Sequence, residues 1–183
     1  MALHGPTPRW LTFDCYGTLI QWDEGLQAAV REILRSHDAD TEGAARLIAV
    51  YDKHEHALEQ EPPHRSFREV AATALQRALE ELNLPFAAED SEILTRGISA
   101  MPPFPEVPGA LAELKAMGFK LCIISNTDDD IIAGNVAQLG GSIDRVITAE
   151  QAQGYKPSSK TFAYAHRELG VAKEEIVHIC ASP

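Results

Sequence analysis

The stretch LTFDCYGTL, residues Leu11–Leu19, is the one around which the rest of this chain is arranged. The apolar, β-branched and aromatic run Trp10–Phe13 predicts a short buried strand, and it ends in Asp14. An acid at the carboxyl end of a buried strand has its backbone fixed by the sheet, and its side chain points into the crevice where α/β folds bind ligands. Gly17 allows a sharp turn that brings the Thr18 hydroxyl back toward the carboxylate. The alternative is an aspartate that only caps the following turn.

The composition is that of a soluble globular protein with a strong acidic charge. The 183 residues fit one domain, or a core with a small inserted lobe. The net charge of −11 argues against nucleic acid or an anionic membrane as a partner, and it requires local positive groups to hold a small anionic substrate. Neither a signal peptide nor a membrane span is predicted. Cys15, Cys122 and Cys180 predict core residues in a reducing compartment, so we expect a cytoplasmic protein.

Apolar residues recur at helical spacing almost throughout the segment that follows the first strand. The predicted helices cover Asp23–Asp38, Asp40–Leu58, Phe67–Leu82 and Glu89–Ser99. Ser66 followed by Glu69 matches a capping box at the start of the third. Residues 20–100 are therefore expected to be nearly all helical.

The proline-rich run Met101–Pro105 changes the character of the chain, because it cannot continue a helix. Beyond it, apolar strands alternate with helices. The predicted strands are Phe119–Asn126, Arg145–Thr148 and Glu175–Cys180, and the predicted helices are Glu106–Met117, Asp128–Leu139 and Lys160–Leu169. Such alternation implies βαβ units and a parallel sheet. We expect an α/β fold, with a Rossmann-like parallel-sheet core at residues 1–19 and 101–183 and an inserted all-helical cap at residues 20–100.

Polar groups follow each of the other strands and would meet Asp14 at one edge of this sheet. They are Ser125-Asn126, Lys156 within Tyr155-Lys156-Pro157, and Ala181-Ser182. Adjacent parallel strands deliver their carboxyl ends to one crevice, so the recurrence is more informative than any single match. A lysine cation there would offset the charge of the carboxylate. Taken singly, each group could instead be a turn or a solvated loop residue.

These groups resemble the motifs of the haloacid dehalogenase superfamily, and more narrowly those of the type II (S)-2-haloacid dehalogenases. Phe-Asp-x-Tyr-Gly-Thr-Leu at 13–19 is similar to the first motif, Ser125-Asn126 to the second, and Tyr155-Lys156-Pro157 to the third. The resemblance spans the whole chain. It implies that Asp14 is a covalent nucleophile and that Ser125-Asn126 binds the substrate carboxylate.

Two positions depart from the phosphatase branch of the superfamily. That branch has a general acid two residues after the nucleophile, where this chain has Tyr16, and a metal-binding acid in the fourth motif, where it has Ala181. A phenol that titrates near about 10 is a poor substitute for a carboxylate at neutral pH. The paired losses favour a site without metal, and we expect no cofactor.

The chemistry that remains is displacement at carbon. Asp14 would attack the carbon that bears the halogen and expel halide, leaving an ester that water hydrolyses. A leaving halide needs no proton, so Tyr16 can line the halide or alkyl pocket. We therefore predict hydrolytic dehalogenation of short (S)-2-haloalkanoic acids to 2-hydroxy acids. The resemblance implies catalytic roles for Asp14, Thr18, Lys156 and Ser182, and substrate contacts from Cys15, Tyr16, Arg46, Ser125 and Asn126.

Three features depart from the dehalogenase pattern. The cap arginine that helps to hold the halide falls by spacing at Arg46, although the surrounding pattern could place Asp52 there. Phe162 stands where many relatives have tyrosine. The family's last acid, which orients or activates the hydrolytic water, should come shortly beyond Pro183, so the chain resembles a truncated enzyme that could alkylate Asp14 without turning over well.

Two other hypotheses stay open. One is a magnesium-dependent phosphatase of the same superfamily, and the other is a catalytically incomplete fragment whose exposed edge strand at 176–180 self-associates. The family also suggests a homodimer. Halide release measured beside phosphate release would separate the two enzyme classes.

Overall fold

The computed structural model describes residues 8–181 and divides the chain into two compact units. One unit takes in the chain up to Gln21 and again from Pro102, and the other runs Trp22–Met101. The outgoing and returning segments of the first unit are bonded to each other, because Gln21 N donates to the Pro102 carbonyl at 3.0 Å and Ile20 forms an antiparallel bridge with Pro103. A long insertion therefore leaves and re-enters the first unit at neighbouring points.

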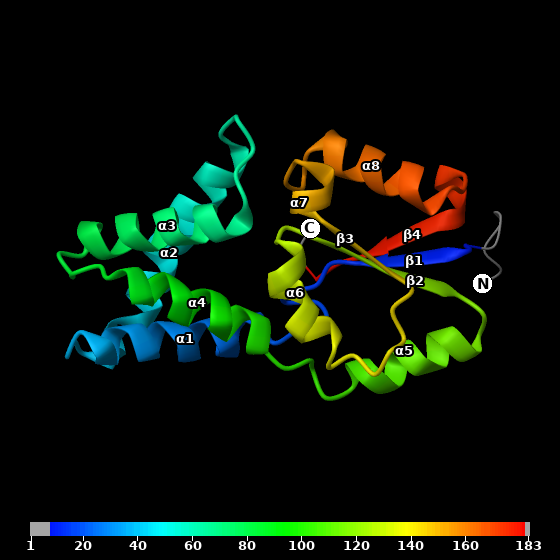
Figure 1. Cartoon of the computed structure of the whole chain (residues 1–183). Helices are drawn as coiled ribbons and strands as arrows, with labels where there is room; N and C mark the ends of the chain where they lie inside the picture. The colour runs from blue at the N-terminus through cyan, green and yellow to red at the C-terminus, as the bar shows by residue number, and fades with distance from the viewer. Residues whose placement is uncertain (1–7, 182–183) are drawn as a thin grey trace. The chain divides into compact units, whose positions relative to one another are not determined.

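A parallel sheet with the strand order β3-β2-β1-β4 forms the centre of the first unit (Figure 1). The strands are β1 Trp10–Phe13, β2 Lys120–Ser125, β3 Arg145–Thr148 and β4 Ile176–Ile179. Phe13 at the end of β1 lies between Ile123 of β2 and Ile179 of β4. The predicted α/β fold with a parallel sheet is confirmed. The predicted edge position of the last strand is confirmed too, and Val177 and Ile179 are exposed there.

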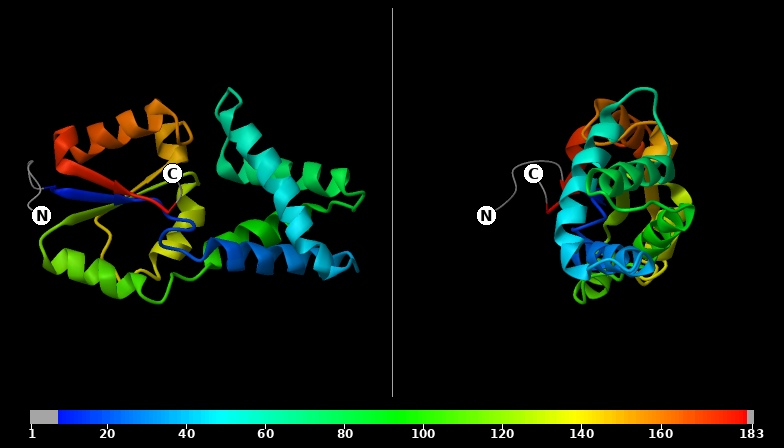
Figure 2. Two further views of the ribbon diagram at one scale, coloured as in Figure 1. Left: turned by 180° about the vertical axis from the view of Figure 1, so that it is seen from behind. Right: turned by 90° about the vertical axis from the view of Figure 1, so that its left-hand side faces the viewer.

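Helices cover both faces of this sheet, with α8 on one face and α5 on the other (Figure 1 and Figure 2). The helices of the first unit are α5 Val107–Ala116, α6 Asp129–Val136, α7 Ala149–Ala152 and α8 Ser159–Leu169, with the short 3-10 turn η2 Lys173–Glu175 before β4. The sheet side chains that face α8 pack against Ala165 and Leu169. They are Trp10, Cys122, Ile124 and Ile147.

Two local differences from the predicted elements lie in this unit. The helix predicted over Asp128–Leu139 ends at Val136, because the N–H groups of Gln138 and Leu139 donate to carbonyls three residues earlier rather than four, which tightens the chain into turns. Helix α7 lies in a segment for which no helix was predicted, where the Thr148 hydroxyl accepts from Gln151 N and so caps a single turn.

The second unit consists of helices. They are α1 Trp22–Ser36, the 3-10 turn η1 Thr41–Gly43, α2 Ala44–Gln60, α3 Phe67–Glu81 and α4 Ala88–Ala100. The capping box predicted at Ser66 is confirmed, since its hydroxyl accepts from Glu69 N and its own N–H donates to the Glu69 carboxylate. Helices α1 and α4 approach closely at Gly97, where an added Cβ would come within 2.8 Å of the Ala29 Cβ. In the described part of the chain, no helix is both long and apolar enough to cross a membrane.

Candidate active site

Asp14 stands at the carboxyl end of β1, where the strand order of the sheet changes direction. Its backbone N–H donates to the carbonyl of Ile179, the last residue of β4, at 2.9 Å, so the Asp14 backbone is still held by the sheet. Its side chain lies beyond Phe13, the last paired residue of β1, and 22% of the side-chain area is exposed. This is the position at which open α/β sheets bind ligands.

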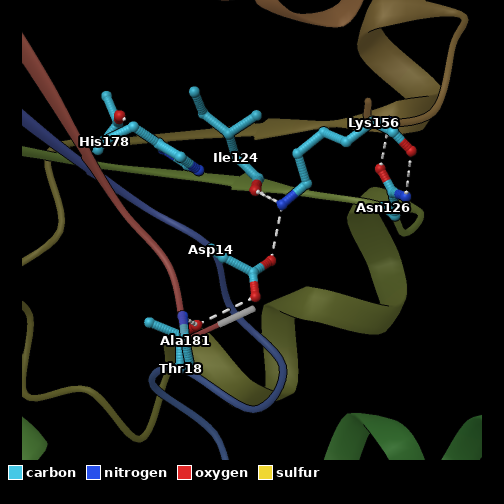
Figure 3. Close-up of polar contacts among 8 residues, drawn as sticks. Asp14, Thr18, Ile124, Asn126, Lys156, His178 and Ala181 are labelled. Carbon is cyan, nitrogen blue, oxygen red and sulfur yellow. Dashed lines mark hydrogen bonds and ion pairs between the residues drawn. The ribbon is translucent and has the colours of Figure 1, made fainter. Parts of the chain in front are cut away.

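The two carboxylate oxygens of Asp14 each receive one donor (Figure 3). Lys156 Nζ donates to Oδ1 at 2.7 Å, and Thr18 Oγ1 donates to Oδ2 at 3.1 Å. Thr18 Oγ1 in turn accepts from the backbone N–H of Ala181 at 3.0 Å. Because a hydroxyl has a single proton, this incoming donor directs the Thr18 proton toward Asp14. The carboxylate is therefore fixed from both sides.

The turn after Asp14 places Thr18 for this contact. Gly17 has a φ of +79°, a left-handed conformation that favours glycine. The carbonyl of Cys15 accepts from Leu19 N at 2.8 Å and from Ile20 N at 3.0 Å, which closes the turn over the strand end. The chain thus folds back on itself within four residues of the nucleophile candidate.

Lys156 reaches the same point from the loop that leads into α8. Its ammonium donates to the Ile124 carbonyl at 2.8 Å as well as to Asp14, and its side chain is only 16% exposed. An ammonium has three N–H donors, and these contacts use two of them. The remaining donor can bind an anionic substrate beside Asp14.

Ser125 ends β2 at this edge of the sheet and Asn126 follows it, and the two side chains have different partners. The Ser125 hydroxyl is buried and has no hydrogen-bond partner within residues 8–181. A buried hydroxyl without a partner costs free energy, which makes Ser125 a candidate for binding a ligand. The amide of Asn126 instead bonds to the backbone of Lys156, with Oδ1 accepting from Lys156 N at 2.6 Å.

Cys15 and Tyr16 follow Asp14 directly, at the start of the same turn. The Tyr16 hydroxyl donates to Asn135 Oδ1 of α6 at 3.0 Å, and burial raises the pKa of this phenol. The Cys15 side chain is fully buried, and burial raises the pKa of its thiol as well. Both groups therefore stay protonated at neutral pH, and the thiol packs inside the core.

His178 of β4 belongs to the surroundings of the site, although no motif in the sequence pointed to it. Its Nδ1 lies 2.9 Å from the Thr12 hydroxyl on β1, and its ring meets Phe162 edge-on at 5.8 Å. Burial, together with the nearby charge of Lys156, lowers the pKa of His178. The signal that could have found it is the strand register, which pairs His178 with Thr12.

The remaining candidates lie elsewhere in the chain. Arg46 is exposed on α2 of the helical unit, and Asp52, the alternative to it, lies on the same helix. Ser182 is outside the described residues. The structure therefore brings together Asp14 and Thr18, which belong to one stretch of the sequence, with Lys156, which lies 142 residues beyond Asp14.

The donor set around Asp14 does not suit magnesium. Tyr16 donates its hydroxyl to Asn135, and Ala181 contributes only a backbone N–H. Neither supplies the carboxylate oxygen that this hard cation prefers. A partly exposed carboxylate held by a cation and a hydroxyl is instead suited to act as a nucleophile.

Comparison with known proteins agrees with this arrangement. The family described as haloacid dehalogenase-like hydrolase matches residues 8–179. The haloacetate dehalogenase H-2 of Moraxella sp. (strain B) is 29% identical over 119 residues, and this match covers 64% of the chain and 53% of that protein. The (S)-2-haloacid dehalogenase of Pseudomonas sp. (strain YL) is 26% identical over 179 residues, with 94% of the chain and 74% of that protein covered. The chain thus spans about half of the first relative and about three quarters of the second.

Solved structures show the same fold. The L-2-haloacid dehalogenase RSc1362 superposes with a TM-score of 0.84 at 23% identity, covering 96% of the chain and 79% of that protein. The L-2-haloacid dehalogenase from Xanthobacter autotrophicus with chloropropionic acid covalently bound superposes with a TM-score of 0.78 at 22% identity, covering 94% of the chain and 69% of that protein.

Proposed function

The chain belongs to the haloacid dehalogenase-like hydrolases, and we propose that within this family it is a 2-haloacid dehalogenase. The substrate is a short (S)-2-haloalkanoic acid, the product is the 2-hydroxy acid, and the intermediate is an ester on Asp14. The observation that carries the proposal is the Asp14 carboxylate, held between the Lys156 ammonium at 2.7 Å and the Thr18 hydroxyl at 3.1 Å. Relatives named as haloacetate and (S)-2-haloacid dehalogenases support it.

In the first half-reaction an Asp14 oxygen attacks C2 of the substrate. The new C–O bond forms as the carbon–halogen bond breaks, and the halide leaves with the bonding electron pair. No proton is transferred, which agrees with the engagement of the Tyr16 hydroxyl by Asn135. Tyr16 then serves as part of the wall of the site.

The substrate carboxylate needs donors, because a net charge of −11 repels an anion. The remaining N–H of Lys156 and the unpartnered hydroxyl of Ser125 are suited to this role. In the second half-reaction water adds to the ester carbonyl of Asp14, and the Lys156 ammonium stands beside the oxygen on which negative charge develops. The bond between the Asp14 carbonyl carbon and the substrate oxygen then breaks, one proton of the water passes to the hydroxyl of the departing 2-hydroxy acid and the other to solvent, and the Asp14 carboxylate is restored.

Arg46 and Ser182 complete the proposed set. Arg46 would hold the leaving halide, as the family resemblance implies, and Ser182 would act at the fourth motif. Cys15 is included for its place in the first motif, and because its thiol is fully buried, its backbone rather than its side chain would contact the substrate.

Halide release tests the proposal most directly. The full-length protein is incubated with (S)- and (R)-2-chloropropionate, and chloride and lactate are quantified beside phosphate release from p-nitrophenyl phosphate with Mg²⁺. We expect chloride from the (S) enantiomer and lactate in equal amount. Magnesium-dependent phosphate release without chloride would overturn the proposal and favour the phosphatase alternative.

We also propose a cytoplasmic homodimer with neither nucleic acid nor membrane as a partner. Cys15 and Cys122 are buried and unpaired, which suits a reducing compartment, and the acidic charge disfavours polyanions. Light scattering coupled to gel filtration measures the assembly, and a monomer at micromolar concentration would contradict the dimer.

A further inference from the structure

The side chain of Asn126 holds the backbone of Lys156 at two points (Figure 3). Asn126 Oδ1 accepts from Lys156 N at 2.6 Å, and Asn126 Nδ2 donates to the Lys156 carbonyl at 3.1 Å. An amide side chain can offer this donor and acceptor side by side, in the way that a neighbouring strand offers its backbone. We call this pair of bonds the Asn126 clamp.

The Asn126 clamp satisfies both backbone hydrogen-bonding groups of Lys156. In the part of the chain that the structure describes, the N–H and the carbonyl of Lys156 have no other hydrogen-bond partner. The residue lies between α7 and α8, outside the sheet, so no strand neighbour can satisfy these groups. Without the clamp, two backbone groups of a largely buried lysine would have to find new partners.

The same strand end also holds the other end of this lysine. The Ile124 carbonyl accepts from Lys156 Nζ at 2.8 Å, two residues before Asn126. Strand β2 and the residue that follows it therefore hold Lys156 both at its ammonium and at its backbone, and β2 is paired with β1, which ends next to Asp14. The 2.7 Å contact between Lys156 and Asp14 is thus defined by the sheet rather than by the loop.

We propose that Asn126 is a positioning residue that acts on the reaction through Lys156. This inference rests on the proposed function and differs from the role that the motif resemblance implies, in which Asn126 binds the substrate carboxylate. Loss of the clamp would let the loop move and misplace the ammonium relative to Asp14. Misplacement of a catalytic group by about 1 Å can cost roughly a hundredfold in rate.

Hydrogen exchange tests the clamp itself and does not depend on activity. Asn126→Asp keeps the acceptor for Lys156 N and puts an oxygen against the Lys156 carbonyl, whereas Asn126→Ala removes both bonds. We expect about tenfold faster exchange at the Lys156 amide in either variant, and faster acylation of its amine, with other segments unchanged. The control Gln138→Glu makes the same amide-to-acid change at an exposed position on the turn after α6. Unchanged exchange at Lys156 would overturn the proposal.

A double-mutant cycle tests how Asn126 acts on the reaction. Asp14 ester formation from (S)-2-bromopropionate is followed by mass spectrometry for Asn126→Ala in the native and in the Lys156→Met background. In the native background we expect Asn126→Ala to slow ester formation by about tenfold to a hundredfold, with little change in the half-saturating substrate concentration. In the Lys156→Met background the same substitution should slow it by at most about twofold. Equal losses in both backgrounds would show direct substrate contact and overturn the proposal.

The two experiments separate failure of this inference from failure of the proposed function. If the native protein forms no ester on Asp14, the dehalogenase proposal fails, and hydrogen exchange alone then decides whether the clamp holds Lys156. If ester forms and exchange at Lys156 is unaffected by Asn126→Ala, the dehalogenase proposal stands and the clamp is rejected.

Discussion

Asp14 of the sheet unit and Glu55 of the helical unit are carboxyl groups that are at least partly shielded from water, and their partners differ. Asp14 receives the Lys156 ammonium and the Thr18 hydroxyl. Glu55 of α2 is 8% exposed, and its Oε1 accepts a hydrogen bond from the Tyr51 hydroxyl at 2.8 Å. Burial raises the pKa of Glu55 to about 7, with the Tyr51 bond opposing that shift. The Glu55 carboxyl group therefore takes up a proton as the pH falls through about 7, whereas the Asp14 carboxylate is paired with the Lys156 ammonium.

The difference supports the proposal that Asp14 rather than Glu55 is the reactive carboxyl group. Tyr51 and Glu55 are four residues apart, so one turn of a helix is enough to bring them together. Asp14 and Lys156 are separated by 142 residues, and their contact needs the complete sheet. Such a pair arises only when the whole unit is folded, and its partly exposed carboxylate remains accessible to a substrate.

The largest effect is expected from Asp14→Asn. This variant removes the nucleophile while keeping the shape of the side chain, so ester formation with (S)-2-bromopropionate should fall by roughly a million-fold, below detection. Intact mass and peptide mapping measure the adduct, and far-UV circular dichroism confirms the fold. An adduct that persists on another carboxyl group, such as that of Glu55, would contradict the proposal that Asp14 is the carboxyl group that reacts.

Replacement of Lys156 by an uncharged residue should leave Asp14, like Glu55, without a lysine ammonium beside its carboxyl group. Lys156→Met keeps the aliphatic stem and deletes the charge, and we expect ester formation to slow by about a hundredfold to a thousandfold. Lys173→Met, at an exposed lysine of η2, is the matched control and should leave the rate unchanged. Equal rates in native and Lys156→Met proteins would mean that the ion pair has no part in the reaction.

The converse test neutralises the carboxyl group of the helical unit. Because the folded pKa of Glu55 lies above its unfolded value of 4.5, folding binds a proton, and stability falls as the pH rises from 4.5 to about 7. Glu55→Gln removes this loss and should raise the free energy of unfolding at pH 8 by roughly 3 kcal/mol, with little change at pH 4. Urea unfolding followed by tryptophan fluorescence measures it, since Trp22 begins α1.

The control for this test is Glu42→Gln, at an exposed glutamate of η1. It should leave the pH dependence as in the native protein. A slope between pH 4.5 and 7 that survives in Glu55→Gln would assign the dependence to other groups.

The sequence predicted those features that depend on local spacing. The helices, the capping box at Ser66 and the strand that ends in Asp14 follow from apolar periodicity and nearby polar residues. The parallel sheet follows from the alternation of strands and helices. These inferences need no knowledge of distant contacts, which is why they could be made from the order of the residues.

Features that depend on distant pairings could not be predicted in the same way. The contact of Asn126 with the backbone of Lys156, and that of Tyr16 with Asn135, join residues far apart in the sequence. His178 enters the site region only through its register with Thr12. Side-chain amides and hydroxyls have many alternative partners, and only the three-dimensional arrangement selects among them.

Thr18 offers the finest test, because its removal would take one neutral hydrogen bond from Asp14 and leave the cation in place. Thr18→Val keeps the branched shape, loses the donor to Asp14 Oδ2 and leaves the Ala181 N–H without its acceptor. One such bond contributes about 1 kcal/mol, so ester formation should slow by roughly fivefold to tenfold. Thr18→Ser restores the hydroxyl and should recover most of the rate. If Thr18→Ser were as slow as Thr18→Val, return of the hydroxyl would not restore the reaction, the hydrogen bond would not account for the role of Thr18, and only the cation would then distinguish the surroundings of Asp14 from those of Glu55.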